Sequence, residues 1–417
     1  MVFNKFKLKE LLQVNPRMTL KKGSKAKKIA MENIKEFQKK IDNFTIEEFK
    51  SGSKFQNGDT LLARITPCLE NGKTAYVDIL EDDEIAFGST EFFVLRPIDN
   101  KLDSHFLYYL FRTKKIREII IKSMTGTSGR QRAQKDSIFE YECEIPNIEY
   151  QRKIAIILKN LDDKIEINKK IIANLEELSQ TLFKHWFVDF EFPDENGAPY
   201  KANGGEMIDS ELGKIPKGWI VKSLDEIANY INGLAMQKYP SNKEESLPIV
   251  KIKELKNGFT DENSNRCTTE IPEKAKIDNG DIIFSWSATL LVKMWAGGKA
   301  GLNQHLFKVT SETFPKWFYY LWTKRYIEYF INIANDKATT MGHINRKHLS
   351  HAKIVLPTQL QLDNFDKIFH NLLEKQLNTE EEIKRLIELR DTLLPKLMSG
   401  EIEIPDDVEV NTDELSI

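Results

Sequence analysis

The second half of this 417-residue chain repeats the plan of the first half about 211 residues further on. Pro146–Phe187 aligns without a gap against Pro357–Met398, and Asn57-Gly58-Asp59 recurs as Asn279-Gly280-Asp281. This period exceeds the roughly 20 to 50 residues of a solenoid repeat. The sequence therefore predicts two whole domains in tandem. Two like modules suit a ligand with two nearby equivalent sites, such as duplex DNA.

Each copy ends in a stretch whose apolar residues are spaced alternately by four and three positions. This is the a/d seam of a coiled coil, sustained for about four and a half heptads. We expect two helices of about 38 residues, each roughly 55 Å long, that pack on each other. Polar residues interrupt the seam at Asn168, Ser179, Gln376, Thr379 and Arg390, and such residues commonly fix register. The apolar seam comprises Ile154, Leu158, Leu161, Ile165, Ile172, Leu175, Leu182, Phe365, Phe369, Leu372, Ile383, Leu386, Leu393 and Leu397.

Either orientation of the two long helices is sterically possible, because a complete globular domain connects them along the chain. A parallel pair would place the globular domains side by side. An antiparallel pair would place them at opposite ends, related by a pseudo-twofold axis. We favour the antiparallel coiled coil, because modules related by a twofold match the symmetry of a duplex backbone.

The globular parts are expected to have a mixed α/β (α+β) fold. Each copy is predicted to open with a short helix, and its last strand to end before Pro146 or Pro357. An amphipathic helix is expected at about Ser104–Ser123 in the first copy and at Pro315–Ala334 in the second. The strand predictions are Thr60–Ile65, Ala75–Ile79, Glu91–Leu95, Asp281–Trp286 and His305–Val309.

These patterns divide the chain into six segments. The stretch from Asp189 to Trp219 is rich in Gly, Pro and acidic residues and is interpreted as a surface linker. The predicted bounds are 1–148 and 216–358 for the globular domains, 149–187 and 359–399 for the long helices, 188–215 for the acidic linker and 400–417 for an acidic tail.

The net charge of −2 hides a separation of charge along the sequence. The tail from Glu401 carries −7 and residues 188–215 carry −5, so the rest of the chain carries +10. Met1–Ala30 holds nine basic residues and one acid, and Arg112–Lys135 holds eight and one. Localised positive charge is typical of phosphate binding, although solvated helix surfaces are the simpler alternative.

Other classes of function find little support in the sequence. No apolar run approaches the roughly 18 residues of a membrane span, and three scattered cysteines fit a reducing cytoplasm. No Asn/Asp-Pro-Pro-aromatic tetrapeptide is present to hold a flipped adenine. Gly213–Gly218 resembles the start of a P-loop, but Trp219 stands where the lysine must be. His343, His348 and His351 match no standard zinc spacing, so no metal site is predicted.

Taken together, the doubled motifs resemble those of the specificity (S) subunit of type I restriction-modification systems over nearly the full chain. The residues that carry the resemblance occur in the same order in both copies. They are Phe55–Arg64 with Ile277–Phe284, Phe87–Phe92 with Gly301–Leu306, Ile145–Gln151 with Leu356–Gln361, and Leu175–Phe187 with Leu393–Gly400. The acidic tail after Gly400 has no counterpart in this resemblance.

The resemblance implies a protein with two target-recognition domains spaced by two helices in an antiparallel coiled coil. It implies a subunit that is not catalytic by itself and belongs to a DNA adenine methyltransferase/endonuclease complex. The implied partners are double-stranded DNA, two modification (methyltransferase) subunits and, optionally, restriction (endonuclease/translocase) subunits, with no membrane. The chain itself is expected to bind no cofactor, while S-adenosylmethionine is expected on the modification subunits. A prokaryotic cytoplasmic location follows.

Polar loops after strands and after the amphipathic helix are the candidate DNA-binding segments. Lys and Arg would contact phosphates, whereas Arg to guanine and Asn or Gln to adenine are strong base pairings. Any one of these residues could instead be a turn residue or a surface charge. The candidates are Arg64, Ser89, Thr90, Ser128, Arg130, Gln131, Arg132, Ser285, Trp286, Asn303, Gln304, His343, Asn345 and Arg346.

Three rival functions remain open from the sequence. A free-standing DNA-binding regulator with two reading domains would act without a methyltransferase. A self-contained restriction-methylation enzyme conflicts with the missing tetrapeptide. A coiled-coil adaptor without DNA would leave the two basic stretches unexplained.

Overall fold

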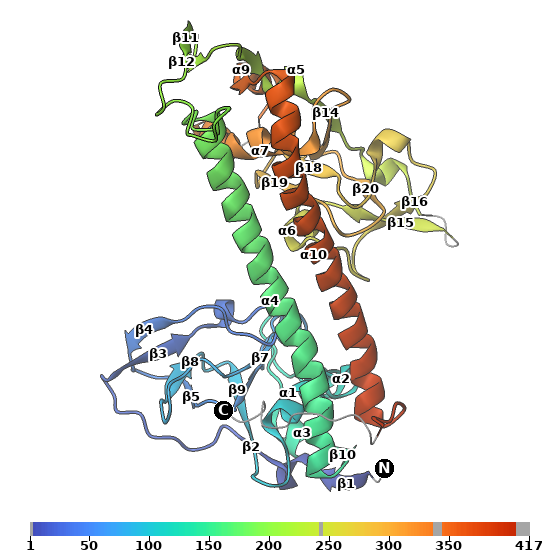
Figure 1. Cartoon of the computed structure of the whole chain (residues 1–417). Helices are drawn as coiled ribbons and strands as arrows, with labels where there is room; N and C mark the ends of the chain where they lie inside the picture. Colours follow the sequence, from blue (N-terminus) through green and yellow to red (C-terminus); the bar gives the residue numbers. More distant parts are fainter. Residues whose placement is uncertain (1–2, 242–244, 337–343, 406–417) are drawn as a thin grey trace. The chain divides into compact units, whose positions relative to one another are not determined.

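A computed structural model describes residues 3–241, 245–336 and 344–405 (Figure 1). Contacts within the chain define two units. Unit 1 comprises Met1–Glu166 and Arg385–Ile417, and unit 2 comprises Ile167–Lys384. Each unit contains a globular part and one half of each long helix. Each globular part therefore includes one half of each long helix in its core. The segment bounds predicted from the sequence placed the long helices outside the globular domains.

The strands of unit 1 form three small sheets. They are β1 (Asn4–Lys7), β2 (Leu12–Val14), β3 (Lys25–Ile29), β4 (Thr45–Glu48), β5 (Ser53–Phe55), β6 (Thr60–Ala63), β7 (Thr74–Tyr76), β8 (Ala86–Gly88), β9 (Phe92–Pro97) and β10 (Glu142–Ile145). β1 pairs with β10, and the four-stranded sheets have the orders β2-β9-β6-β7 and β4-β3-β8-β5. Only β3 and β8 run parallel among the pairs of described strands in this unit.

The part of unit 2 that follows Trp219 repeats this topology, with one counterpart for every strand of unit 1. Its strands are β13 (Ile220–Ser223), β14 (Asn229–Asn232), β15 (Ser246–Val250), β16 (Arg266–Thr268), β17 (Lys276–Ile277), β18 (Ile282–Ser285), β19 (Leu291–Met294), β20 (Ala300–Leu302), β21 (Leu306–Thr310) and β22 (Lys353–Leu356). β13 pairs with β22, and the larger sheets have the orders β14-β21-β18-β19 and β16-β15-β20-β17. The parallel pair is again the equivalent one, β15 with β20. The predicted duplication is thus confirmed at the level of sheet topology.

The short helices differ from the sequence-based expectation in two ways. Each copy of the repeated topology opens with a strand, β1 or β13, and the short helix follows it. The amphipathic helices that were expected at Ser104–Ser123 and Pro315–Ala334 are each divided into two helices. The shorter helical elements are η1 (Leu8–Glu10), η2 (Met31–Asn33), α1 (Ser104–Arg112), α2 (Lys114–Lys122), α3 (Lys135–Phe139), α5 (Leu224–Ile227), η3 (Met236–Lys238), α6 (Ile252–Asn257), η4 (Glu273–Ala275), α7 (Lys316–Arg325), α8 (Ile327–Asp336) and α9 (Arg346–His351).

Thr113 explains why the first amphipathic helix is interrupted. Its backbone is extended, with ψ of 139°, and both its N–H and its hydroxyl donate to the carbonyl of Leu110. A threonine hydroxyl that bonds the backbone locally competes with the helical ladder. α1 itself begins at Asp103, whose carboxylate accepts from the N–H of Phe106 at 2.9 Å, a standard N-cap arrangement.

The long helices are α4 (Ile148–Phe187) and α10 (Gln359–Ser399). Both begin directly after a proline and a capping residue. Asn147 accepts from the N–H of Tyr150 through its side chain at 2.9 Å, and the Thr358 hydroxyl accepts from the N–H of Gln361. Proline and cap together stop the preceding strand and satisfy the first helical N–H groups. The same start signal therefore operates in both copies.

The two long helices are antiparallel. In unit 1, Asp162 of α4 bonds Arg390 of α10, and Ile154 shares a buried cluster with Leu397. In unit 2, Glu176 of α4 bonds Gln376 of α10, and the ring of Trp186 lies 4.9 Å from that of Phe365. Residue numbers thus rise along α4 while they fall along α10. Within each unit, Figure 1 shows the halves of α4 and α10 running in opposite directions. All the apolar seam residues are buried or half-buried, and the polar seam residues Asn168, Ser179, Gln376, Thr379 and Arg390 are buried.

Each unit has a core that combines sheet, aromatic helix and long-helix residues. In unit 1, Tyr108 and Phe111 of α1 belong to one buried cluster with Ile154 of α4 and Leu397 of α10. In unit 2, Trp317 of α7 stacks on Phe369 of α10, with ring centroids 4.5 Å apart. The helix halves are consequently fixed to their own globular part by burial of large apolar side chains.

The repeated Asn-Gly-Asp segment is a structural turn in both units. Gly58 and Gly280 have φ of 85° and 83°, a conformation that glycine adopts without steric cost. Asp59 accepts from the N–H of Gln56 and forms a two-point ion pair with Arg96. Burial raises the pKa of Asp59, and this ion pair only partly offsets that effect. In unit 2, Asp281 pairs with Lys308 at 2.8 Å.

The acidic segment after α4 is not the simple surface linker expected from its composition. Phe192 is buried and stacks on Trp219, with ring centroids 4.9 Å apart. The chain then forms a hairpin of β11 (Met207–Ser210) and β12 (Gly213–Pro216). Polar composition concealed the aromatic anchors of this segment. At the other end of the chain, Ile404 is buried in unit 1 and its N–H donates to the hydroxyl of Tyr150.

Candidate functional site: polar loops of the two recognition domains

Three segments of unit 1 that carry candidate residues lie against one another. They are the end of β6 with Arg64, the loop Ser89–Glu91 before β9, and the loop Thr125–Ala133. The N–H of Arg64 donates to the carbonyl of Glu91 at 3.0 Å, and the N–H of Ala133 donates to the carbonyl of Arg64 at 2.8 Å. The sequence separates these segments widely, and the sheet brings them together.

An ion pair joins the loop Thr125–Ala133 to the loop Ser89–Glu91. The Nε of Arg132 donates to both carboxylate oxygens of Glu91 at 3.0 Å, and its Nη2 donates to Oε1 at 2.7 Å. The two side chains are 45% and 23% exposed, so the pair lies at the surface. Hydrogen bonding to Glu91 raises the pKa of Arg132. Its guanidinium group therefore stays charged under all ordinary conditions.

Arg64 is half-buried beneath this surface. Its guanidinium carbon lies 4.7 Å from the centroid of the Phe93 ring, an arrangement typical of a cation–π contact. Its Nε is buried and has no hydrogen-bond partner among the described residues. The contact with Phe93 fixes the direction of the side chain along β9.

The loop between α2 and α3 presents the most exposed candidates. Ser128 and Arg130 are exposed and Gln131 is half-buried. Gly126 and Gly129 have φ of 127° and 78°, so the loop depends on glycine at these two positions. Its ends are tied together, because Thr125 and Arg132 exchange backbone hydrogen bonds of 3.0 and 2.9 Å.

Unit 2 contains the same arrangement with different side chains. The N–H of Trp286 donates to the carbonyl of His305, and the N–H of Ile344 donates to the carbonyl of Trp286. Trp286 thus occupies the place of Arg64, and its ring lies 5.8 Å from that of Phe307. His305 takes the place of Glu91, and its Nδ1 is 3.2 Å from the hydroxyl of Ser287.

The structure places the other candidates of unit 2 at different depths. Ser285 is fully buried and its hydroxyl donates to the carbonyl of Ser287. Asn303 is buried and its Oδ1 accepts from the N–H of His305. Gln304 is half-buried and lies next to the His305 ring, with 3.3 Å between Nε2 atoms. Among these residues, only Gln304 and His305 have side chains that reach the surface.

The remaining candidates of the second copy lie at the start of α9. Asn345 is exposed and is the N-cap residue of that helix. Arg346 is exposed, donates to the carbonyl of Tyr230 at 2.9 Å and lies over the Phe307 ring. His343, together with the rest of the loop Thr339–His343, lies outside the described residues. Ser89 and Thr90 in unit 1 are half-buried and exposed, and the Ser89 hydroxyl accepts from the N–H of Glu91.

The basic stretches are less available for phosphate than their composition suggests. Lys5, Lys7, Lys9, Lys27 and Lys28 of the first stretch all form ion pairs with acidic side chains. In the second stretch, Arg112 is buried and Arg117 donates to a backbone carbonyl. The other six basic residues of that stretch are exposed, namely Lys114, Lys115, Lys122, Arg130, Arg132 and Lys135.

Sequence reasoning missed two residues of these sites, Glu91 and His305. Both stand third in the equivalent triplets Ser89-Thr90-Glu91 and Asn303-Gln304-His305. An acid within a basic region looks like a turn residue when its partner is unknown. The aligned triplets themselves were the available signal, because their first two residues were already candidates.

A buried polar cluster holds the helix pair against the globular part of unit 1. Arg390 and Asp162 form an ion pair of 2.6 Å with both side chains 6% exposed, and the Tyr109 hydroxyl donates to the same carboxylate. Burial by itself would raise the pKa of Asp162, but Arg390 and Arg112 outweigh this and lower the pKa. In unit 2 the aligned positions are Leu373 and Ser179, and the polar contacts there instead join Glu176 to Gln376 and Lys324.

The described residues, 3–241, 245–336 and 344–405, offer neither a metal site nor a membrane span. No group of three or more His, Cys, Asp or Glu side chains there could hold a metal ion, and no helix there could cross a bilayer. All three cysteines are free.

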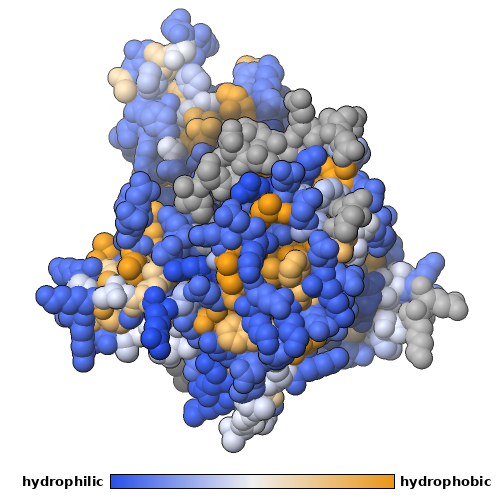
Figure 2. All heavy atoms as spheres, turned by 90° about the horizontal axis from the view of Figure 1, so that it is seen from below, coloured by the Kyte–Doolittle hydropathy of each residue, from blue (hydrophilic) through white to orange (hydrophobic). Residues whose placement is uncertain are grey.

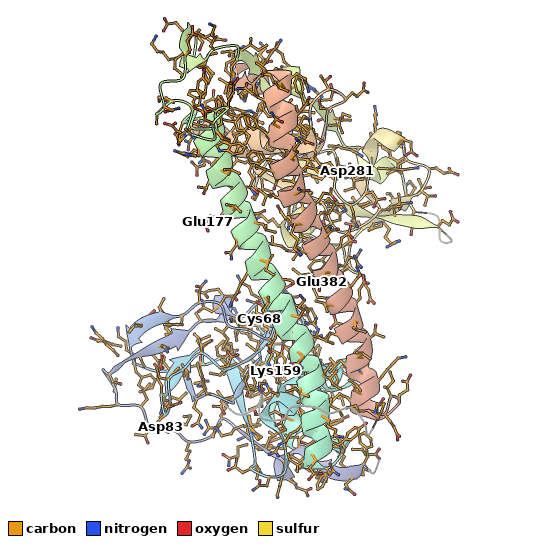
Figure 3. All side chains as sticks on the ribbon, viewed as in Figure 1. Cys68, Asp83, Lys159, Glu177, Asp281 and Glu382 are labelled. Carbon is orange, nitrogen blue, oxygen red and sulfur yellow. The ribbon has the colours of Figure 1, made fainter. Side chains whose placement is uncertain are left out.

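Figure 2 shows one face on which hydrophilic residues predominate and hydrophobic ones form smaller patches. In Figure 3, Lys159 lies on α4, where it pairs with Asp163, and Asp281 precedes β18.

Two copies of one domain, each with convergent polar loops and joined by a shared helix pair, define a duplicated recognition protein. A family described as the type I restriction modification DNA specificity domain matches residues 2–177 and 216–389. The chain belongs to this family and is a specificity subunit, the DNA-recognition subunit of a type I restriction-modification system. The resemblance inferred from the sequence is confirmed, and nothing in the comparisons favours a free-standing regulator.

Individual relatives agree with this assignment. The specificity subunit of the type I restriction enzyme MjaIX of Methanocaldococcus jannaschii is 31% identical over 309 residues, covering 72% of this chain and 69% of the relative. The HindI specificity subunit of Haemophilus influenzae is 28% identical over 409 residues, covering 83% and 87%. The solved S subunit from M. genitalium has a TM-score of 0.53 at 17% identity, covering 98% and 97%, and supports the fold alone.

Proposed function

We propose that each unit reads one half of a split DNA target through its convergent polar loops, while the helix pair sets the unread spacer between the halves. The observation that carries this proposal is the same three-segment loop arrangement in both units, built from different side chains. An identical scaffold with changed side chains is what two readers of different half-sites require. Base edges in the grooves discriminate sequence, and phosphate contacts supply most of the affinity.

The partners follow from membership of the family rather than from any contact in this chain. We propose that two modification subunits carrying S-adenosylmethionine dock on the chain, and that restriction subunits can join them. The chain then selects the adenine-containing target, and the modification subunits perform the methylation. The cofactor would be held entirely by those subunits. The complex would act in the prokaryotic cytoplasm, where the host DNA is found.

Separate reading by the two units can be tested with one substitution set in each. We expect Arg130→Ala with Arg132→Ala to weaken recognition of one half-site and to leave the base preference at the other unchanged. Gln304→Ala, the variant that tests unit 2, should affect only the other half-site. The measurement is methylome sequencing of a host that expresses the complex. Equal loss of preference at both half-sites would contradict modular reading.

Purification distinguishes this function from that of a free-standing regulator. The full chain should co-purify with a modification subunit, and selective DNA binding should be strongest in that complex. Affinity should fall steeply with salt, because each neutralised phosphate contributes a slope of about −0.9 in log K against log salt. A chain that binds its target tightly and selectively without any modification subunit would support the regulator instead.

A further inference from the structure

We propose that Glu91 is a positioning residue that directs Arg132 toward a guanine in the half-site read by unit 1. This inference rests on the proposed function and deepens it by naming a base and the pair of side chains that selects it. It assigns a role to an acidic residue at a surface that must approach polyanionic DNA. A carboxylate at such a surface repels the phosphates of DNA and lowers the affinity. Its presence there is explained if it improves the selection of a base.

The geometry of the ion pair leaves one edge of the guanidinium group available. Glu91 engages Nε and Nη2 of Arg132, which lie on the same side of the planar group. The other terminal nitrogen, Nη1, has no hydrogen-bond partner among the described residues. Nη1 and the second hydrogen of Nη2 together form the end-on fork of donors. Two parallel donors at fixed spacing suit two neighbouring acceptors.

Both members of the pair stand on backbone that is already fixed. The carbonyl of Glu91 accepts from Arg64, and its N–H donates to the Ser89 hydroxyl at 3.1 Å. Arg132 is bonded in both directions to Thr125 and lies in a bridge with Ile65. The three hydrogen bonds to Glu91 therefore restrict the Arg132 side chain before DNA arrives. Preorganisation of this kind increases selectivity, because a wrong base cannot be met by an alternative rotamer.

Guanine is the base that matches this fork. In the major groove guanine presents two acceptors, O6 and N7, whereas adenine presents one acceptor and one donor. A phosphate could also accept from the fork, but Glu91 neutralises the charge of Arg132 and so weakens long-range attraction to a phosphate. The hydrogen bonds to the uncharged acceptors of a base are weakened less by this loss of net charge than the attraction to a phosphate. The pair is thus better suited to base reading than a lone arginine.

Unit 2 does not contain this device among its described residues. His305 replaces Glu91, and it contacts Ser287 and Gln304. A histidine cannot accept two hydrogen bonds from an arginine side edge in the manner of a carboxylate. The inference is therefore limited to the half-site that unit 1 reads, and the two half-sites should differ in how they depend on these positions.

The test begins with the full chain in complex with its modification subunits and a randomised duplex library. The wild-type complex should select a split sequence with a guanine in the half-site of unit 1. Arg132→Lys should lower the preference for that guanine by about 5- to 150-fold, the range expected for loss of a bidentate contact. Glu91→Gln should lower it several-fold, while the second half-site is unchanged. The exposed neighbour Arg130 provides the control, because Arg130→Gln should weaken all sequences equally.

A merely structural role for Glu91 would give a different result. Glu91→Asp shortens the side chain but keeps its charge, whereas Glu91→Gln keeps the length and loses the charge. Glu91→Asp should therefore retain more of the preference for guanine than Glu91→Gln. Equal preference in Glu91→Gln and the wild type, or equal loss in Glu91→Asp and Glu91→Gln, would overturn the inference. Failure of the proposed function is distinguishable, because the wild-type complex would then select no split sequence at all.

Discussion

At the scale of single residues, the buried pair of Asp162 and Arg390 makes a sharp prediction about stability. Arg390→Met leaves the Asp162 carboxylate buried without its closest cation, and breaking such a pair typically costs about 3–5 kcal/mol. The free energy of unfolding in urea should fall by that amount at neutral pH. Tyr109→Phe/Asp162→Leu/Arg390→Met removes the carboxylate together with both of its hydrogen-bond donors, while Arg112 keeps Asp391 as a partner at 3.8 Å, and it should recover most of the loss. An equally unstable triple variant would contradict the electrostatic explanation.

The pH dependence of this pair has a defined sign. The pKa of Asp162 is lower in the folded chain than in the unfolded chain. Its contribution is therefore fully present above the unfolded value of about 3.9 and is lost as the pH falls through the folded value. In Arg390→Met the carboxylate loses this stabilisation, so the deficit relative to the wild type should shrink as the pH falls below about 4.

Single residues were predicted from the sequence only where periodicity identified them. The heptad pattern located Arg390 on the seam, and the structure buries it there. It did not identify Asp162, which follows the seam position Leu161 and meets a partner 228 residues away. Glu91 and His305 were missed for the same reason, since their partners are distant in sequence. Local patterns reveal burial well and long-range pairing poorly.

At the scale of elements, Gly88 in β8 shows how closely the parallel strands of unit 1 approach. A Cβ atom on Gly88 would lie 2.4 Å from the carbonyl oxygen of Ile29 in β3. Gly88→Ala should therefore lower stability by about 1–3 kcal/mol through overpacking, measured by thermal unfolding. Gly301→Ala in β20 is the comparison variant, because the three atoms nearest its Cβ would all belong to side chains, those of Cys267, Ile271 and Met236. Gly301→Ala should cost less, and the reverse order would refute the argument.

Elements were predicted in proportion to the strength of their periodicity. The strand at Thr60–Ile65 is observed as β6 within two residues, and the last strands end before Pro146 and Pro357 as expected. The helix expected over Ser104–Ser123 is broken at Thr113, because one hydroxyl satisfies a carbonyl that the helix would otherwise use. β3 and β4 were not predicted, since their lysine- and glutamate-rich sequences carry little apolar alternation.

At the scale of the whole molecule, the duplication and the helix pair were the strongest predictions. Both follow from patterns that extend over tens of residues, and the repeated sheet orders and antiparallel contacts confirm them. The acidic segment was misinterpreted because Phe192 and Trp219 are few among many polar residues, although their burial dominates its packing. Average composition describes solvation, whereas a few aromatic side chains determine where a segment attaches.

The proposed role of the helix pair as a spacer gives the last prediction. α4 passes from unit 1 to unit 2 after Glu166, and α10 passes back after Lys384. One heptad inserted at each of these points lengthens both helices by about 10.5 Å and nearly preserves the seam, because seven residues make almost two turns. At about 3.4 Å per base pair, the preferred unread spacer should lengthen by roughly three base pairs in methylome sequencing. Insertion into α4 alone is the control, because it shifts one seam against the other and should lower stability instead. A complex with both insertions that still methylates the original spacing would show that the helices do not set the distance.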